Sequence, residues 1–395
     1  MRADFVVAGG GIGGSVLAEL LARGGKRVVV LERSLAPPAW TRPEILWPAT
    51  ADFLATLHPR ELFETSCARP FGGFDIDDGR GARPLVPAEA LRIAGVRPWS
   101  TEPNALRELL LSRASFELRR GVEVEALLRD RDRVVGVRAK DLASGATSEI
   151  EAEWTAGDDG VRSVVRRELG IELEVRMFPI DFLCFGPVWP DGLDPSRVRI
   201  WANRGGTGSG VLGLGIVPLP NGRATALVLA LPKAFEDPRT AGDWERFLDR
   251  DPILRAVVGA RRFPGDFARV RRPWGHAPSY GEAGALVLGD AAHPVSPAGG
   301  QGASAAVGDA RTIADLALSG PRDLLADYER RRRPPNERSV AVTRLVHRIW
   351  SLPAFCRPNS VFFALLAFLR TNPRALARMV RNVSTRFLER PAGSP

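Results

Sequence analysis

The sequence has few of the side chains that most often bind metals or form covalent cross-links. It contains three cysteines and four histidines among 395 residues. An odd number of scattered cysteines without a CxxC pair predicts free thiols, which suit a reducing cytoplasm, rather than a disulfide framework. No two of the histidines stand at the spacing of metal ligands. We therefore expect neither a metal site nor a secreted, disulfide-linked protein.

Lysine is almost absent, and arginine carries nearly all of the positive charge. The formal net charge is +9, and the arginines are spread along the chain. The one dense run, residues 330–333, is expected at a helix end because Pro334 and Pro335 follow it. Without a nucleic-acid-binding motif, these arginines are best interpreted as a solvated surface, so no nucleic acid is expected as a partner. The lysines are Lys26, Lys140 and Lys233.

No hydrophobic run is long enough to cross a membrane. The most apolar stretch, residues 361–369, is far shorter than the roughly 20 residues that a spanning helix needs. It predicts a buried helix, or a face that touches a membrane or an apolar substrate entrance. Residues 5–8 are also apolar, but they lead directly into glycines as a buried strand does, so no signal peptide is expected. These features favour a cytoplasmic protein and leave open peripheral membrane contact through the C-terminal helices.

The chain alternates between two kinds of pattern. Residues 1–31 read strand, glycine-rich loop, helix and strand, which predicts a βαβ unit. Residues 177–232 contain short alternating apolar runs, which predict an antiparallel sheet. A buried strand at 285–288 then leads into a second glycine-rich loop and a helix at 302–317. The order predicts an α/β fold, with a β-sheet domain inserted into a Rossmann-like domain and C-terminal helices after it. Helical periodicity is also present at residues 45–57, 103–118 and 243–258.

The first glycine-rich loop carries a dinucleotide-binding motif. Gly9, Gly11 and Gly14 give GxGxxG between a strand and a helix, where glycines let the backbone approach a pyrophosphate at the helix N-terminus. Glu32 ends the next strand, and its carboxylate is placed to accept hydrogen bonds from a ribose diol. The motif alone does not distinguish NAD from FAD. The expected contacts in this unit are Gly9, Gly11, Ile12, Gly13, Gly14 and Glu32.

The second glycine-rich loop carries the most specific motif. Residues 289–304 read GDAAHPVSPAGGQGAS after a buried strand. This stretch resembles the flavoprotein aromatic hydroxylases (group A flavoprotein monooxygenases), a family that includes p-hydroxybenzoate hydroxylase and the ubiquinone-pathway hydroxylases and carries GDAAHxxxPxxGQGxN. Asp290 at the strand end can bind a ribityl hydroxyl. The N-terminus of the following helix is a fitting partner for the negative charge of reduced flavin. Ser304 stands where the family often has asparagine.

Two further segments carry the same resemblance. Residues 157–163, GDDGVRS, are similar to the family's GADGxxS motif, which is tied to both FAD and NAD(P)H, with Asp158 in place of the usual alanine or cysteine. Residues 217–223 are similar to a strand and turn of the family's substrate domain. The resemblance therefore implies a GR2-type FAD-binding domain, FAD as the cofactor and NAD(P)H as the reductant.

The resemblance also implies individual flavin contacts. Arg42 falls where the family places an arginine after the second strand, and Arg107 can replace a family arginine whose own position holds Pro103. His293 and Pro297 are expected beside the flavin, with His293 structural or flavin-adjacent rather than an acid or base. No catalytic side chain is expected, because the flavin carries the chemistry. The remaining implied contacts are Arg33, Val124, Asp159, Gly160, Asp290, Gly299, Gly300, Gln301, Gly302 and Ala303.

The family's chemistry is monooxygenation. Its members reduce FAD with NAD(P)H and transfer one atom of O2 through a flavin C4a-hydroperoxide. The resemblance therefore implies hydroxylation or epoxidation of a small molecule, in secondary metabolism. A flavin-dependent halogenase is an alternative, although residues 212–218 lack the tryptophans of the halogenase motif WxWxIP and lysine is scarce. A flavin reductase that saturates isoprenoid double bonds is a second alternative, and a non-enzymatic protein with an FAD fold is a third.

The inserted sheet suggests the kind of substrate. Because histidine and tyrosine are scarce there, a hydrophobic molecule such as a quinone, quinolone, polyketide or isoprenoid is favoured over a small charged acid. The pocket is expected between the flavin and this sheet. The candidate lining residues, each of which could equally be ordinary core, are Trp47, Phe185, Trp189, Trp201, Leu212 and Leu214.

The patterns also predict how the chain is divided. The FAD-binding domain is expected to be discontinuous, with the substrate domain inserted twice and a helical region at the C-terminus. The predicted ranges are 1–75, 98–176 and 268–330 for the FAD-binding domain, 76–97 and 177–267 for the substrate domain, and 331–395 for the C-terminal helices.

Overall fold

The computed structural model describes most of the chain. The described residues are 2–37, 43–77, 79, 81–112, 115–186, 192–202, 209–259, 267–297, 300–351 and 372–385. Four features singled out in the sequence lie outside them, namely Arg42, Trp189, Gly299 and residues 361–369.

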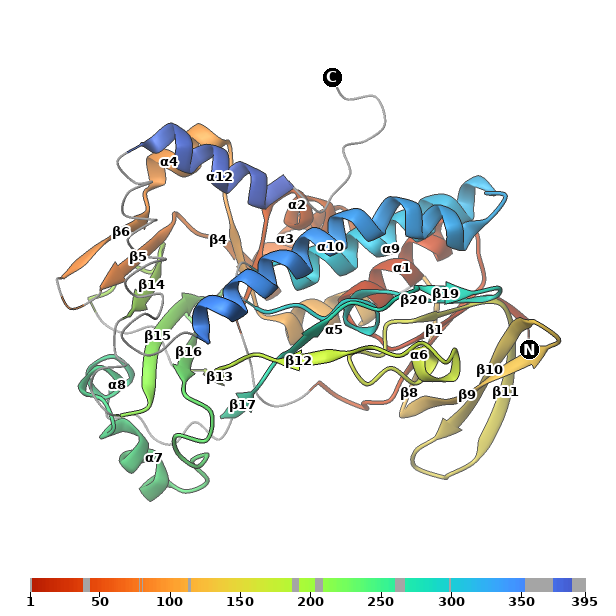
Figure 1. The fold of residues 1–395 in the computed structure, drawn as a ribbon, viewed down its shortest axis with the longest axis horizontal. Coiled ribbons are helices and arrows are strands. Elements are labelled where there is room, and N and C mark those ends of the chain that lie inside the picture. Colours follow the sequence, from red (N-terminus) through yellow and green to blue (C-terminus); the bar gives the residue numbers. More distant parts are fainter. Residues whose placement is uncertain are drawn as a thin grey trace.

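An eight-stranded sheet forms one half of the molecule (Figure 1). Its main path runs β19-β20-β11-β1-β2-β8, and β10 and β9 extend it beside β11. β1 is parallel to β2 and to β11, and β20 is parallel to β11, as in nucleotide-binding βαβ folds. The strands are β1 (Arg2–Ala8), β2 (Val28–Glu32), β8 (Glu117–Arg120), β9 (Val122–Asp130), β10 (Arg133–Asp141), β11 (Thr147–Gly157), β19 (Gly281–Glu282) and β20 (Ala285–Val287).

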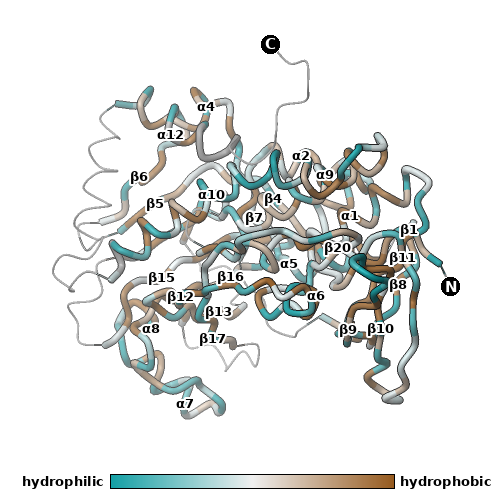
Figure 2. Tube along the Cα trace, turned by 45° about the vertical axis from the view of Figure 1, so that its right-hand side comes forward, coloured by the Kyte–Doolittle hydropathy of each residue, from teal (hydrophilic) through white to brown (hydrophobic). Residues whose placement is uncertain are grey.

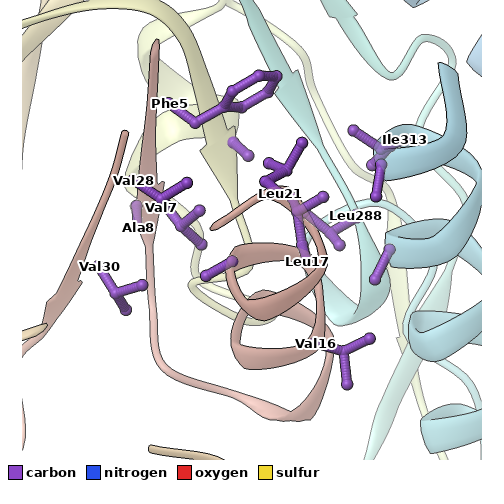
Figure 3. Close-up of a cluster of buried hydrophobic side chains, with 14 of the residues drawn as sticks. Phe5, Val7, Ala8, Val16, Leu17, Leu21, Val28, Val30, Leu288 and Ile313 are labelled. Atoms are coloured by element: carbon purple, nitrogen blue, oxygen red, sulfur yellow. The ribbon is translucent and has the colours of Figure 1, made fainter. Parts of the chain in front are cut away.

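The core of this half lies between the sheet and two helices, α1 (Ile12–Arg23) and α9 (Gly302–Ser319). Val7 on β1, Leu17 on α1 and Ile313 on α9 are fully buried and lie together (Figure 3). β1, β2 and β20 are mostly apolar and buried along their length, as expected for parallel strands covered on both faces. This packing fixes the glycine-rich loop at the carboxyl end of β1, where parallel sheets bind their ligands.

A seven-stranded sheet, ordered β17-β13-β16-β15-β14-β5-β6, forms the other half (Figure 1). Helices α7 (Ala241–Leu248) and α8 (Pro252–Val258) pack on one face over a core that includes Leu183 and Trp244. Side chains alternate between the faces of a strand, so every second residue points to the opposite face. The strands are β5 (Phe74–Asp77), β6 (Ala82–Val86), β13 (Asp181–Phe185), β14 (Val198–Trp201), β15 (Val211–Pro218), β16 (Ala224–Ala230) and β17 (Ala268–Val270).

Short elements complete the structure around these two halves. β7 joins β3 and β4 in a small sheet, and β12 pairs with β18. The strands are β3 (Glu44–Leu46), β4 (Ala68–Pro70), β7 (Trp99–Thr101), β12 (Val175–Met177) and β18 (Pro273–Gly275). The helices are α2 (Pro48–Leu57), α3 (Arg60–Leu62), the π-helix η1 (Phe63–Cys67), α4 (Ala88–Ala94), α5 (Pro103–Ser112), α6 (Val164–Glu168) and the 3-10 helix η3 (Gly289–Ala291).

The C-terminal helices correct one prediction. α10 (Leu324–Trp350) lies along α9 and continues through Pro334 and Pro335, so the arginine run does not mark a helix end. Arg332 and Asn336, on either side of the prolines, both bind Asp309 of α9, and these buried contacts hold the helix together there. Figure 2 shows many hydrophilic residues along α10 and α12 (Pro373–Thr385), the latter packed on α4. Within the described ranges, no helix is both long and apolar enough to span a bilayer.

Three segments predicted to be single helices differ from the prediction. Residues 45–57 begin in β3, and helix α2 starts only at Pro48, a residue favoured in a first helical turn. Residues 103–118 divide into α5 and the start of β8, which pairs with β2. Residues 243–258 divide into α7 and α8 because Asp251 caps a new helix whose first residue is Pro252.

Candidate functional site

The loop between β1 and α1 has a shape that requires glycine. Gly9 has a φ of +98°, and a Cβ added to it would clash with the Asp158 backbone. A Cβ added to Gly11 would lie 2.6 Å from a carboxylate oxygen of Asp158. The first turn of α1 can therefore meet a ligand at backbone distance, with its N–H groups and helix dipole favouring an anion.

Glu32 and Arg107 form a polar pair beside this loop. The buried Glu32 carboxylate accepts hydrogen bonds from the backbone N–H of Gly10 (2.9 Å) and of Ser34 (2.7 Å). Arg107 on α5 places its Nη2 3.2 Å from Glu32 Oε1. Its Nε is buried and has no hydrogen-bond partner among the described residues. Since buried donors are nearly always satisfied, this atom fits a ligand that supplies an acceptor.

Asp158 lies against the start of α1. Its Oδ2 accepts a 2.6 Å hydrogen bond from the N–H of Gly14, and its Oδ1 would lie 2.8 Å from a Cβ added to Gly289. Burial, together with the charges of Asp290, Asp159 and Asp309, raises the pKa of Asp158 well above its usual value, although the bond from Gly14 opposes the rise. The carboxyl group of Asp158 thus lies between the two glycine-rich loops.

Asp159 and Gly160 form the turn before α6. Asp159 accepts hydrogen bonds from the backbone N–H of Val164 (2.7 Å) and Val165 (3.2 Å), which satisfies the first turn of the helix. Burial raises the pKa of Asp159 despite these bonds. Its second oxygen has no hydrogen-bond partner in the described part of the chain. Gly160 has a φ of +77° with open space around it, so the turn can receive a bound group.

Contacts with Asp309 of α9 hold the loop after β20 in place. Asp309 accepts a hydrogen bond from the N–H of Gly289 (3.1 Å) and lies 2.5 Å from Nε2 of the buried His293. Arg166 of α6 donates to the carbonyl oxygen of Ala291 (2.8 Å). The side chain of His293 is thus engaged in the core, which gives it a structural contact.

Asp309 also belongs to a buried polar network that extends into α10. Arg332 Nε (2.8 Å) and Asn336 Nδ2 (3.0 Å) both donate to Asp309 Oδ1. Asn336 also reaches the Tyr280 hydroxyl, which lies 2.6 Å from His276 Nε2. Burial acts to raise the pKa of Asp309, but His293 and Arg332 outweigh it and hold the pKa below its usual value. Burial lowers the pKa of His276 to about 4, so this histidine is neutral at physiological pH.

The side chain of Asp290, the second residue of the loop, bonds to the edge of the seven-stranded sheet and not to α9. Its Oδ2 lies 3.0 Å from Nη2 of Arg272, a residue between β17 and β18. Both side chains are about a quarter exposed, at 26% for Arg272 and 29% for Asp290. Asp290 thus links the loop to the edge of the seven-stranded sheet.

An apolar cavity of about 310 Å³ lies between this sheet and the second glycine-rich loop. Pro297, Gly300, Gln301 and Gly302 form one wall, so the N-terminus of α9 faces the cavity. The opposite wall consists of alternate residues of the sheet, and the only charged lining residues within the described chain are Glu44 and Arg272. The sheet residues in the lining are Phe74, Phe182, Cys184, Val198, Ile200, Gly215, Val217, Leu227, Leu229 and Val270.

The lining residues expected from the sequence lie elsewhere among the described residues. Phe185, Trp201 and Leu214 pack in the core under α7 and α8, because strand alternation turns them to the face opposite the cavity. Leu212 packs in a separate cluster near β18, and Trp47 packs with α4 and α12. Phe185, Trp201 and Leu214 therefore lie on three strands that border the cavity, but on the opposite face of each strand.

The other predicted contacts have varied surroundings. Arg33 is exposed just after β2, whereas Val124 on β9 and Ala303 in α9 are buried. Gly300 has a φ of +61°, and a Cβ there would lie 2.9 Å from Ile45 Cβ. Ser304 is buried and accepts a hydrogen bond from Thr50 (2.9 Å).

Sequence reasoning missed three residues of this region. Arg272 carries no motif, since its position depends on which strand edge faces the loop. Asp309 had a weak signal, because it is an acid that follows a run of small or apolar residues, 303–308, in a predicted helix. Arg332 could not be separated from its neighbours in the arginine run, yet its side chain is 1% exposed.

The residues fit an FAD molecule. The first turn of α1 and the glycines before it can receive a diphosphate, and Glu32 can accept hydrogen bonds from a ribose. The buried Nε of Arg107 supplies a donor that needs an acceptor. Pro297 and the N-terminus of α9 border the apolar cavity, which suits the ring end of the cofactor. The carboxyl group of Asp158, when ionised, disfavours an anion here.

Comparison with known proteins gives the same assignment. Residues 2–343 match the profile of a family described as FAD binding domain. Over 361 residues the chain is 28% identical to the 12-dehydrotetracycline 5-monooxygenase/anhydrotetracycline 6-monooxygenase of Streptomyces rimosus, covering 85% of this chain and 67% of that protein. It is 28% identical to the dialkyldecalin synthase of Streptomyces rugosporus over 98% of this chain and 77% of that protein.

A solved structure shows the same architecture. The structure of PqsL of P. aeruginosa, in complex with 2-aminobenzoylacetate, superimposes with a TM-score of 0.69 and 26% identity. The match covers 93% of this chain and 100% of that one. The two-sheet arrangement is therefore shared with a known protein of this kind.

Proposed function

The chain belongs to the FAD binding domain family and is an FAD-dependent monooxygenase, and we propose that it oxygenates a hydrophobic, ring-containing small molecule, as enzymes of polyketide or aromatic secondary metabolism do. The apolar cavity carries this proposal. It is bounded on one side by the FAD-binding loop and on the other by apolar side chains of the sheet. At about 310 Å³ it is at the lower end of the range for small-molecule sites.

In the proposed complex, the cofactor extends between the two glycine-rich loops. Gly11 and the first turn of α1 hold the diphosphate, and Glu32 and Arg107 hold the adenosine ribose. Asp290 binds a ribityl hydroxyl, and Gln301 and its neighbours in the first turn of α9 face the ring. When bound, FAD supplies the redox chemistry, namely reduction by NAD(P)H and transfer of one atom of O2. The sheet's apolar wall excludes water from the reaction and positions the substrate.

The division of the chain is part of the proposal. The FAD-binding domain comprises the eight-stranded sheet with α1 and α9, and the substrate domain comprises the seven-stranded sheet. β5 begins at Phe74 and β17 ends at Val270, so the proposed boundaries lie a few residues outside those expected from the sequence.

The cellular setting is also proposed. Cys67 and Cys184 are buried and form no disulfide among the described residues, which supports a reducing cytoplasm. Val342 and Leu345 are exposed on α10 next to Arg344, which supports peripheral contact of this helix with a membrane. Co-sedimentation with anionic vesicles, compared with neutral ones, tests this contact.

Substrate-stimulated oxidation of the reductant tests the proposed function. The purified protein is expected to show flavin absorbance and to oxidise NADH or NADPH faster with tricyclic or tetracyclic phenols and quinones than alone. Uptake of O2 should rise in parallel. Stimulation by benzoate but by none of the fused-ring compounds would contradict the proposed substrate class. A colourless protein that binds no added FAD would contradict the cofactor assignment.

A further inference from the structure

Arg272 is the only positively charged residue that lines the apolar cavity within the described chain. It follows β17, where successive side chains point to opposite faces of the sheet. Val270 and Arg272 line the cavity, whereas Arg269 and Arg271 bind Asp181 on the other face, at 2.8 and 2.6 Å. The edge of the sheet therefore places one guanidinium in a wall whose other sheet residues are uncharged.

The guanidinium of Arg272 has one hydrogen-bond partner, and most of its N–H donors are not used by described residues. Nη2 of Arg272 lies 3.0 Å from Asp290, and its side chain makes no other hydrogen bond to a described residue. A guanidinium has five N–H donors, so several remain for a ligand. Because Asp290 belongs to the proposed flavin-binding loop, Arg272 is positioned at the junction of cofactor and substrate.

Glu44 places a second charged side chain in the wall of the cavity. This residue of β3 also lines the cavity, and its Oε2 is buried without a hydrogen-bond partner in the described structure. A carboxylate at one point of an apolar wall and a guanidinium at another orient a polar ligand, because an anionic oxygen is attracted to the cation and repelled by the acid. An acidic ring oxygen would therefore be directed towards Arg272.

We propose that Arg272 is a specificity-determining residue that binds an acidic oxygen, a phenolate or enolate, on the fused-ring substrate. Such a charge-assisted hydrogen bond is stronger in apolar surroundings than in water. The oxygen would be bound as an anion, so the cavity would favour the ionised form of the substrate over a neutral ether of the same size. This inference rests on the proposed function, since it assigns the substrate class of the same cavity.

Binding of a coloured phenol to the holoenzyme tests the proposal. Alizarin, whose visible absorbance reports its ionisation, is compared with 1,2-dimethoxyanthraquinone, which cannot ionise. The wild type is expected to bind ionised alizarin at least about tenfold more tightly than the ether and to lower the pKa of the bound dye. Arg272→Met should remove both effects, and Arg272→Lys should keep part of them.

The neighbouring arginine supplies a matched control. Arg271→Met removes the same charge from the other face of the sheet and should leave the preference for ionised alizarin unchanged. The FAD content of each variant is measured, so that loss of cofactor is distinguished from loss of the dye contact. Absence of any preference in the wild type, or a preference that survives in Arg272→Met, overturns the role of Arg272. Absence of oxygen transfer by a wild type that keeps the preference contradicts only the proposed function.

Discussion

Asp158 stands where the related motif usually has alanine or cysteine, and its surroundings show what this change entails. Its carboxyl group accepts the N–H of Gly14, a donor in the first turn of α1. Asp159, Asp290 and Asp309 lie near enough to raise its pKa further after burial has raised it. An ionised Asp158 would repel a diphosphate at the same helix N-terminus, so the protonated form is the one compatible with bound FAD.

Asp158→Asn is expected to make the protein less sensitive to alkaline pH. The folded-state pKa of Asp158 lies above its unfolded value, so its stabilising contribution is complete below the usual Asp pKa and is lost as pH rises through the raised value. Between the two pKa values the loss amounts to at most about 1.4 kcal/mol per pH unit, and above the raised value it is complete. The unfolding free energy of the variant should exceed that of the wild type at pH 8 and match it near pH 4.

Titration of FAD into the apoprotein at several pH values is a second test of the protonation state of Asp158. The affinity of the wild type should fall with rising pH more steeply than that of Asp158→Asn. Asp132→Asn, a change in an exposed turn, serves as the control. Parallel pH profiles for wild type and Asp158→Asn would show that the carboxyl group does not face the cofactor site.

Arg332 shows how a residue within a charged run can have a role that its neighbours lack. Removing its side chain would leave Asp309 buried with one fewer cation, and breaking a buried ion pair costs about 3–5 kcal/mol. Arg332→Met is therefore expected to lower the unfolding free energy by about that amount. It should also weaken FAD binding, because Asp309 fixes the loop that carries Asp290.

The adjacent Arg331 is the matched control for this change, because its side chain is exposed. Arg331→Met should change the unfolding free energy by no more than about 0.5 kcal/mol. Denaturant unfolding of the two variants gives the comparison. Equal midpoints for Arg331→Met and Arg332→Met would contradict a buried structural role for Arg332.

At the scale of elements, the sequence predicts best where local patterns decide. α1 follows the first glycine-rich loop as predicted, because glycines precede it and apolar residues recur along it to Leu21. The faces of the inserted strands were not predictable, since the apolar residues at Phe182, Leu183 and Phe185 do not reveal which of them meets the cavity. The sequence could not show that Arg332 and Asn336, on either side of the two prolines of α10, both contact Asp309 of the preceding helix α9.

Two substitutions on paired strands test the assignment of faces. Phe182 and Leu229 are register partners that both line the cavity, whereas Leu183 is fully buried in the core on the other face. Leu229→Trp should fill the cavity and abolish stimulation by fused-ring compounds with little change in stability. Leu183→Ala should lower the unfolding free energy by about 2–5 kcal/mol.

The binding of fused-ring compounds to the two variants completes the test. Leu183→Ala removes no atom that faces the cavity, so the variant that folds should keep its affinity for the ring compounds. An unchanged affinity in Leu229→Trp together with a lost one in Leu183→Ala would mean that the ligand binds on the α7 side of the sheet.

At the scale of the whole molecule, the glycine-rich loops and the seven-stranded sheet bring together distant parts of the chain. The motif at residues 9–14 predicted a dinucleotide, because its glycines have a local backbone requirement, and the resemblance carried by residues 157–163 and 289–304 implied FAD. A pocket between the flavin and the sheet was expected, but its lining could not be predicted, since the tertiary structure decides which face of each strand meets the loop.

Incorporation of ¹⁸O from ¹⁸O2 tests the central claim most directly. The holoenzyme is supplied with NAD(P)H and a fused-ring compound that stimulates its oxidation, and the product is analysed by mass spectrometry. The account predicts a product heavier than the substrate by one oxygen atom, which carries the ¹⁸O label. A product of unchanged mass, as a cyclisation would give, or one heavier by only two hydrogens, as a reduction would give, would contradict it.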